Sequence, residues 1–150
     1  MENVKKNAII FLQSLVNQSL CYGLKSSDMD LYDFGFANLV DSDSWNNELC
    51  THFLHILCRF KVIFKANKQP TKKYYEDTPG EEFFFDIQRL LGLKVRRVAL
   101  SDKNDLWLDL GDYWVVFATF ENDEESWRFF TADTNSPHLV VSNSWLEFQP

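Results

Sequence analysis

The strongest constraint on the fold is a series of short segments in the C-terminal half whose apolar side chains fall at every second position. These segments are residues 93–100, 105–110, 113–121, 126–132 and 138–147. Such alternation is typical of β-strands that are buried on one face only. Short polar links separate the segments, and links of this length join antiparallel neighbours. This half is therefore predicted to form an antiparallel meander.

The N-terminal half has helical spacing instead. Apolar side chains recur three or four positions apart over residues 3–22, which predicts an amphipathic helix that stops at Gly23. A second stretch of this kind follows the capping residues 41–44, so a second helix is predicted from there to about Arg59.

A third helix is predicted between Thr78 and Gly92. Thr78, Pro79 and Glu81 have the spacing of a capping box with proline at the first helical position. The apolar positions of this helix are Phe83, Phe84, Ile87, Leu90 and Leu91.

Strands are also predicted at residues 32–36 and 60–66, with the longest loop at 67–78. Helices gathered early in the chain and strands gathered late indicate an α+β protein. The predicted fold is a single domain, residues 1–150, with about three helices packed on one face of a mainly antiparallel sheet of five to seven strands.

The charge of the chain is unevenly distributed. The net charge is −7, and residues 76–150 contain fifteen Asp and Glu against six Lys and Arg. Residues 1–75 contain seven against nine, and four of the five Trp lie in the second half. Because phosphate binding requires a basic surface, direct binding of nucleic acid is disfavoured and a basic protein is the favoured partner.

The cysteines and the apolar runs indicate a reducing compartment. Cys21, Cys50 and Cys58 are odd in number and lie in apolar stretches, as expected of reduced thiols in a core. No apolar run approaches the roughly 20 residues of a membrane span, and residues 8–12 lack a following signal-peptide cleavage site. We therefore expect a cytoplasmic protein that does not contact a membrane.

The segment 105–110 divides its side chains most clearly between two faces. One face holds three leucines, predicted to enter the core, and the other holds Asp105, Trp107 and Asp109. Asp105 and Asp109 would lie roughly 13 Å apart along a strand, too far for a catalytic pair of carboxylates. A solvated strand face and a partner-binding surface are the two interpretations of this pattern.

The turn at residues 121–125 contains four carboxylates and is followed by Trp127. One interpretation is a solvated hairpin tip. The other is a surface for a basic protein, because four carboxylates in one turn repel one another unless positive charge compensates them. The ligand spacing of a calcium loop is absent.

Other groups of residues give weaker evidence for a chemical function. Cys50, His52, His55 and Cys58 are zinc-binding residue types on the predicted second helix, but no second cluster completes four ligands and no motif marks an activated thiol. Neither a glycine-rich phosphate loop nor a nucleophile elbow is present. The sequence therefore predicts no catalytic residue, no cofactor and no metal.

Residues 59–73 form a basic segment in a chain that is acidic overall. They contain six Lys and Arg and no acidic residue, and Tyr74 and Tyr75 follow them. Basic residues beside aromatic ones are one footprint of single-strand nucleic-acid binding. Because the rest of the chain is acidic, the preferred interpretation is a patch that balances the acidic half or contributes to a self-interface.

The stretch from Leu106 to Phe148, especially LWLDLGDYWVVFATFENDEESWRFF, resembles the sheet of the small acidic immunity proteins that bacteria encode beside polymorphic or contact-dependent growth-inhibition toxins. The resemblance implies a cytoplasmic protein without enzymatic activity. It also implies binding of one cognate toxin domain, often a cationic nuclease, whose active site or an adjacent surface is covered.

We therefore expect an acidic aromatic surface that steers and anchors a basic toxin domain. Its expected members are Asp105, Trp107, Asp109, Asp112, Glu121, Asp123, Glu124, Glu125 and Trp127. One alternative is a small enzyme or ligand-binding domain whose site lies between sheet and helices and uses some of His52, His55, Tyr74 and Tyr75. A second alternative is a phage-type inhibitor whose carboxylates imitate nucleic-acid phosphates.

Overall fold

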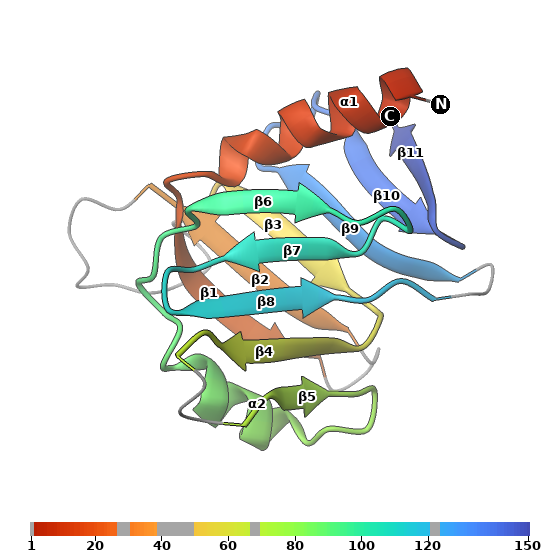
Figure 1. Cartoon of the computed structure of the whole chain (residues 1–150). Helices are drawn as coiled ribbons and strands as arrows, with labels where there is room; N and C mark the ends of the chain where they lie inside the picture. The colour runs from red at the N-terminus through yellow and green to blue at the C-terminus, as the bar shows by residue number, and fades with distance from the viewer. Residues whose placement is uncertain (1, 27–30, 39–49, 67–69, 121–123) are drawn as a thin grey trace.

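Two antiparallel β-sheets packed face to face make up most of the protein (Figure 1). The computed structural model describes residues 2–26, 31–38, 50–66, 70–120 and 124–150. In spatial order, the six-stranded sheet contains β1 (Ser19–Lys25), β2 (Tyr32–Ala37), β3 (His52–Ile56), β9 (Glu125–Thr131), β10 (His138–Ser142) and β11 (Trp145–Gln149). The five-stranded sheet contains β5 (Lys72–Tyr74), β4 (Phe60–Phe64), β8 (Tyr113–Phe117), β7 (Leu106–Asp109) and β6 (Arg97–Leu100).

The two sheets enclose one hydrophobic core. Alternate side chains of both sheets enter it, among them Leu54 and Ile56 of β3 and Leu106 of β7, each with 0% exposure. The chain passes between the sheets after β3, and alternation continues through this crossing into Phe60 of β4, which is also buried. A strand pattern of period two therefore builds the core from both sides.

Two short helices close the two open sides of the sandwich (Figure 1). α1 (Glu2–Leu12), followed by a 3-10 turn at Gln13–Leu15, contacts β6 and β11, which are edge strands of the two sheets. On the opposite side, α2 (Gly80–Ile87) packs on the edge strand β1 and lies beside β5. Neither of these described helices is long and apolar enough to cross a membrane.

This architecture corrects the predicted α+β class. The described residues are mostly β, in two sheets with two short helices, rather than about three helices on one face of a sheet. The helix predicted over residues 3–22 ends at Leu12. Asn17 takes a left-handed conformation, with φ of 74°, and its N–H donates to the carbonyl of Val95, so the chain turns into β1. Gly23, expected to end that helix, lies inside β1.

The second predicted helix is wrong in its described part. β3 occupies this stretch, where it pairs with β2 on one side and β9 on the other. Leu54, Ile56 and Cys58 are buried at every second position, whereas Phe53 and His55 are half-buried. The apolar residues fit both periods, and strand pairing decides between them. The predicted cap and first turn, residues 41–49, lie outside the described residues.

β6, β7, β8 and β9 overlap four of the five strands predicted in the C-terminal half, but the predicted arrangement of this half as one meander is wrong. β8 pairs with β7 and β4, and β9 pairs with β3 and β10, so the link between them crosses from one sheet to the other. The predicted strand 138–147 is a hairpin of β10 and β11. Asn143 and Ser144 have φ of 48° and 62° at its two-residue turn, as the tight turn requires. The predicted loop 67–78 contains β5.

Candidate functional site

Asp105, Trp107 and Asp112, three of the nine residues predicted to bind a partner, lie on or next to β7 and differ in exposure. Asp112 is exposed, whereas Asp105 and Trp107 are half-buried. Oδ1 of Asp105 accepts hydrogen bonds of 2.7 Å from the N–H and 3.0 Å from the hydroxyl of Thr119. The ring of Trp107 packs edge-on against that of Trp114, with 5.7 Å between centroids. Asp105 thus fastens the end of β8, and only part of Trp107 is open to solvent.

Asp109 is the centre of an internal ion-pair network. Its side chain is 6% exposed, and its carboxylate lies 2.6 Å from Nζ of Lys65 and 3.1 Å from Nε of Arg97. Burial acts to raise the pKa of this carboxyl, but Lys65, the N–H of Gly111 and Arg97 together outweigh burial and hold the pKa below its ordinary value. Asp109 therefore remains ionised and neutralises cations of its own sheet, which corrects its expected role as a partner contact.

Trp127, expected to anchor a partner, is part of the core. It lies on β9 with 0% exposure, and its Nε1 donates a 3.1 Å hydrogen bond to the carbonyl of Asn104. The sequence pattern placed it after a polar turn, but the strand alternation of β9 points it inward. Trp127 therefore offers no surface to a partner.

Glu124 and Glu125 are the described residues of the acidic turn, and they lie at the start of β9, on the other sheet from β7. Glu125 forms a 2.7 Å ion pair with Arg128, three positions later, and Glu124 is exposed. Glu121 and Asp123 lie outside the described residues. The described members of the predicted surface are therefore divided between two sheets, and several of their charges are neutralised within the protein.

An acidic aromatic surface is nevertheless present on α2. Phe84 is 54% exposed and Phe85 is 76% exposed. Glu81 precedes these residues by three and four positions, so it neighbours both rings on the helix surface. We define the α2 face as the exposed residues of α2 and the turn before it that carry negative charge or a phenyl ring. Its members are Glu76, Asp77, Glu81, Glu82, Phe84 and Phe85.

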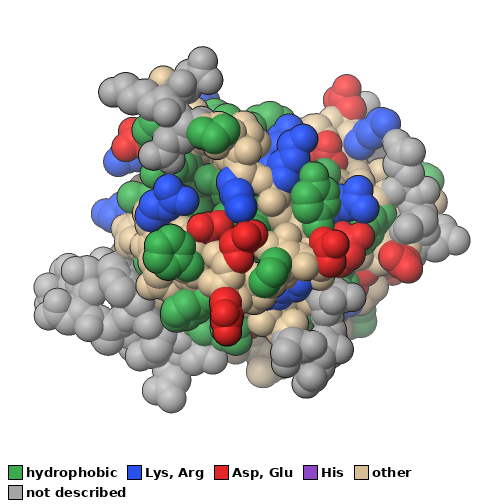
Figure 2. Space-filling view, turned by 90° about the horizontal axis from the view of Figure 1, so that it is seen from below, with side chains coloured by type: hydrophobic (Ala, Val, Ile, Leu, Met, Phe, Trp, Pro, Cys, Tyr) green, Lys and Arg blue, Asp and Glu red, His purple; other side chains and the backbone are tan. Residues whose placement is uncertain are grey.

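Figure 2 views this end of the molecule. Asp and Glu side chains lie close to hydrophobic side chains in the middle of the face, and Lys and Arg side chains lie mainly to one side of them. Exposed apolar side chains rimmed by polar ones are a common feature of interaction sites. The α2 face therefore has the chemical character that sequence analysis placed elsewhere.

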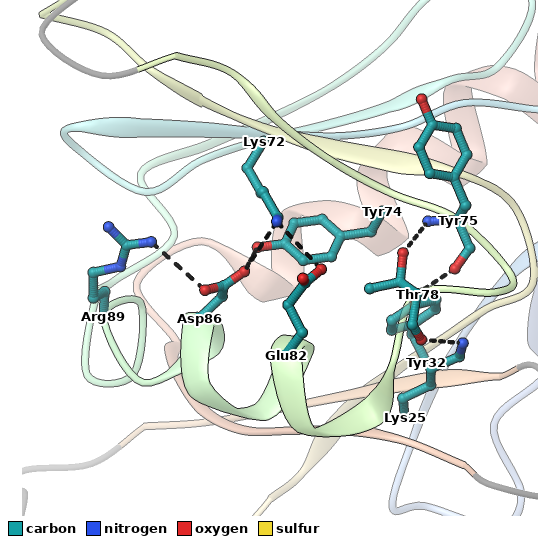
Figure 3. Close-up of polar contacts among 9 residues, drawn as sticks. All are labelled: Lys25, Tyr32, Lys72, Tyr74, Tyr75, Thr78, Glu82, Asp86 and Arg89. Carbon is teal, nitrogen blue, oxygen red and sulfur yellow. Dashed lines mark hydrogen bonds and ion pairs between the residues drawn. The ribbon is translucent and has the colours of Figure 1, made fainter.

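Polar contacts hold α2 against β5 (Figure 3). The hydroxyl of Tyr74 donates a 2.8 Å hydrogen bond to Oδ2 of Asp86, and Nζ of Lys72 lies 3.2 Å from Oε2 of Glu82. Burial and the neighbouring carboxylate of Asp86 raise the pKa of Tyr74 well above its ordinary value, so its hydroxyl remains a donor. These contacts fix the rotation of the helix about its axis, and with it the direction of the outer side chains.

The turn that leads into α2 is also fastened (Figure 3). Oγ1 of Thr78 accepts a 2.9 Å hydrogen bond from the N–H of Tyr75, and the hydroxyl of Tyr32 donates a 2.6 Å bond to the carbonyl of Tyr75. The predicted capping box is wrong, because Pro79 is the N-cap residue and makes no side-chain cap bond. Thr78 stabilises the preceding turn instead.

Close packing brings the inner side of α2 onto β1. A Cβ on Gly23 would lie 2.7 Å from Cγ1 of Ile87, so only glycine allows the helix this close to the strand. Phe83 and Ile87 are 1% and 2% exposed at this contact. Only Phe83 and Ile87 of α2 are buried, so the apolar face of the helix is narrow. Phe84 was predicted to belong to this face, but it lies next to it and is exposed.

The space between α2 and the five-stranded sheet is small. A cavity of about 50 Å³ is lined by Tyr74, Phe83 and Asp86, among others. One water molecule occupies about 30 Å³ of liquid, whereas ligand sites typically measure about 300–1,000 Å³. This cavity is large enough for water, so it does not support a ligand site between α2 and the five-stranded sheet.

The residues considered for zinc are separated by the strand geometry. His52 and His55 are three positions apart on β3 and so face opposite sides of the sheet. Nε2 of His55 lies 3.4 Å from Oδ1 of Asp33, and the His52 ring stacks on Phe129. Among the described residues, no group of three or more His, Cys, Asp or Glu is placed to hold a metal ion.

The three cysteines are buried, as predicted. Sγ of Cys21 and Sγ of Cys50 lie 2.7 Å apart, on either side of β2. A Cβ on Gly35 of β2 would overlap Sγ of Cys50, so a glycine is required beneath this pair.

The exposure of Phe84 and Phe85 was not predicted from the sequence. Phe84 was expected among the apolar positions of the helix, and Phe85 had no predicted role. The usable signal was the four-residue spacing of Phe83 and Ile87, because a helix of eight residues buries one narrow stripe and these two residues define it.

No protein family, curated protein or solved structure matches the chain. The functional proposal consequently rests on the chemistry of the described surfaces.

Proposed function

We propose that this protein is a cytoplasmic, non-enzymatic inhibitor that binds a cationic protein domain through the α2 face. The proposed partner is a basic bacterial toxin domain, such as a nuclease, for which this chain acts as the immunity protein. The supporting observation is one pair of exposed rings, Phe84 and Phe85, next to the carboxylate of Glu81. The proposed binding surface differs from the one expected from sequence. The proposed partner, a basic toxin domain, is the one expected from sequence.

In the proposed complex, the rings of Phe84 and Phe85 contribute most of the binding free energy. Full burial of a phenylalanine side chain contributes about 1.5–3 kcal/mol, and hot-spot residues of interfaces are commonly large side chains that become fully desolvated. Phe84 and Phe85 are both exposed on α2, where consecutive side chains point about 100° apart around the helix axis. A partner that buries both rings would therefore wrap around the outer side of the helix. Affinity is therefore expected to depend on these rings.

The surrounding carboxylates supply steering and selectivity. Glu76, Asp77 and Glu81 lie at or before the start of α2 and are exposed. Charges at the rim of an interface accelerate association with a partner of opposite sign, and salt screens the effect. They also disfavour acidic partners, because like charges repel across an interface.

The fixed position of α2 favours tight binding. Tyr74 and Lys72 hold one side of the helix, and Gly23 allows it to pack closely on β1. A helix already ordered in the free protein pays little conformational entropy on binding. The α2 face is therefore expected to bind its partner without rearrangement.

The test uses the toxin domain encoded beside the gene of this protein, produced in cells together with the full chain. The double variant Phe84→Ser/Phe85→Ser should lose protection of growth and weaken binding about a hundredfold, in line with two lost ring contacts. The matched control is Ile10→Ser/Trp145→Ser, which removes two side chains that are 61% and 57% exposed elsewhere. Equal protection by both double variants, or the absence of a toxin reading frame beside the gene, would contradict the proposal.

A second pair of variants distinguishes the α2 face from the surface expected from sequence. Asp77→Lys/Glu81→Lys reverses two exposed charges of the α2 face, and Asp112→Lys/Glu124→Lys makes the same change in charge on the earlier surface. The first pair should slow association and flatten its dependence on salt, whereas the second should have a smaller effect. The opposite ranking would assign the interface to the earlier surface.

A further inference from the structure

A groove lies on the outer face of the five-stranded sheet, the sheet nearest the viewer in Figure 1. It has a volume of about 270 Å³. Val116 and Ala118 are its small lining residues, and larger side chains from β7, β4, β5 and the residues next to them also line it. Among these are Arg59, Lys61, Lys73, Tyr75 and Trp107. The groove shares no residue with the α2 face, although Arg59 at its edge pairs with Glu76 of that face. The inference about the groove does not depend on the proposed toxin partner.

Strand register places the lining residues in one row. Trp107 of β7 pairs with Val116 of β8, Val116 pairs with Lys61 of β4, and Lys61 pairs with Lys73 of β5. Directly paired residues project from the same face of a sheet. An aromatic ring therefore lies at one end of the row and two ammonium groups at the other, with about 10 Å between the backbones of β7 and β4.

The two lysines form a like-charge pair, which is unfavourable between directly opposed strand positions. Among the described residues, neither ammonium has an ion-pair partner. This differs from the rest of the sheet, where Asp109 neutralises Lys65 and Arg97. A bound anion would relieve the repulsion.

The other charged residues of the groove do not neutralise the lysines. Arg59 adds a third cation, 5.1 Å from the ring of Tyr75 and 3.3 Å from Glu76. Oδ1 of Asp105, the acidic residue of the lining, accepts two hydrogen bonds from Thr119. The groove is therefore electropositive in a protein whose net charge is −7.

We propose that this groove binds a nucleoside monophosphate, with the base against Trp107 and the phosphate between Lys61 and Lys73. A ring and an anionic group on one ligand match the two ends of the row. Stacking of a base on an aromatic side chain contributes about 1–3 kcal/mol, and charge-assisted bonds hold a phosphate. The volume suits one nucleotide unit, and the net negative charge of the chain opposes a long polyanion.

The experiment titrates the full chain with AMP and UMP by calorimetry, and follows quenching of tryptophan fluorescence. Both nucleotides should bind, and adenosine and ribose 5-phosphate should each bind at least about tenfold more weakly, because each lacks one of the two groups. Lys61→Gln/Lys73→Gln should weaken binding about tenfold or more. The matched control Lys6→Gln/Lys94→Gln makes the same change in net charge at exposed positions elsewhere and should leave binding unchanged.

The lysine variant is expected to fold, because it removes an unfavourable pair. Trp107→Leu, checked by circular dichroism, should remove the preference for AMP over ribose 5-phosphate. Three results would overturn the proposal: no heat with either nucleotide, equal affinity of the two lysine double variants, or binding of an oligothymidylate without binding of mononucleotides. Growth protection by Lys61→Gln/Lys73→Gln should remain intact, so failure here and failure of the toxin proposal are separable.

Discussion

The hydroxyl of Tyr74 on β5 and the carboxylate of Asp86 on α2 are joined by a hydrogen bond of 2.8 Å. This bond links the edge of the five-stranded sheet to the helix whose outer side carries Phe84 and Phe85. The orientation of the α2 face is thus coupled to a buried hydroxyl on its inner side.

Removal of this hydroxyl should loosen α2 without opening a large cavity. Tyr74→Phe is expected to lower the free energy of unfolding by about 1.5–3 kcal/mol, the usual range for a hydrogen bond to a charged group. Urea denaturation measures the change. Tyr75→Phe is the control, because the Tyr75 side chain is exposed and its hydroxyl has no described hydrogen bond. A loss no larger for Tyr74→Phe than for Tyr75→Phe would show that the bond does not fasten the helix.

A methyl group at Gly23 should force α2 away from β1. Gly23→Ala places a Cβ 2.7 Å from Cγ1 of Ile87 and is expected to cost about 1–3 kcal/mol in the free energy of unfolding. Gly80→Ala is the matched control, since the nearest atoms to its new Cβ lie 3.9 and 4.0 Å away. The control should be neutral or slightly stabilising, because alanine favours the helix. Equal melting temperatures for the two variants would contradict the close packing.

Three consecutive phenylalanines should respond very differently to truncation. Phe83 is 1% exposed, and Phe83→Ala is expected to cost about 3–5 kcal/mol in stability. Phe85 is 76% exposed, and Phe85→Ser should change stability by no more than about 0.5 kcal/mol. Thermal unfolding of both variants checks this, and a large loss for Phe85→Ser would mean that its ring supports the fold rather than a partner contact.

Asp109 should contribute stability in a pH-dependent way. Its pKa is lower in the folded protein than in the unfolded chain, so its contribution is fully present above the unfolded pKa of about 4 and is lost as pH falls through the folded pKa. Asp109→Asn is expected to cost about 1–2 kcal/mol at pH 7, a range reduced because Arg97 is largely exposed.

Urea denaturation at pH 7 and at progressively lower pH, below 4, gives the check on Asp109. The difference between the wild-type protein and Asp109→Asn should shrink as the pH falls. The exposed Asp112→Asn serves as control and should show little difference at any pH. A gap for Asp109→Asn that stays constant down to the acid transition would argue against an ionised Asp109 in the folded protein.

Local alternation was sufficient to predict most strands, because side-chain period two is a local property of the chain. Leu106, Leu108 and Leu110 were predicted to enter the core, and all three are buried. The same reasoning failed for β3, where the apolar spacing fits both a helix and a strand. Pairing with β2 and β9 decides between them, and those partners are distant in sequence.

The assignment of strands to sheets could not be predicted from local pattern either. The link between β8 and β9 looks like a hairpin turn, yet it joins two sheets. This crossing places Glu125 and Asp109 on different sheets, and the alternation of β9 turns Trp127 into the core. The expected surface is therefore not formed. The exposure of Phe85 depends on the rotation of α2, which Gly23 and Tyr74 set through contacts remote in sequence.

The helix that exposes Phe84 and Phe85 also shields β1, the terminal strand of its sheet. An uncovered terminal strand is a template for pairing with other chains and for aggregation. Substitutions that detach α2 should therefore remove the protein from solution, whereas substitutions of the outward rings should leave it soluble. Solubility thus separates substitutions that damage the fold from substitutions that would affect only the proposed binding surface.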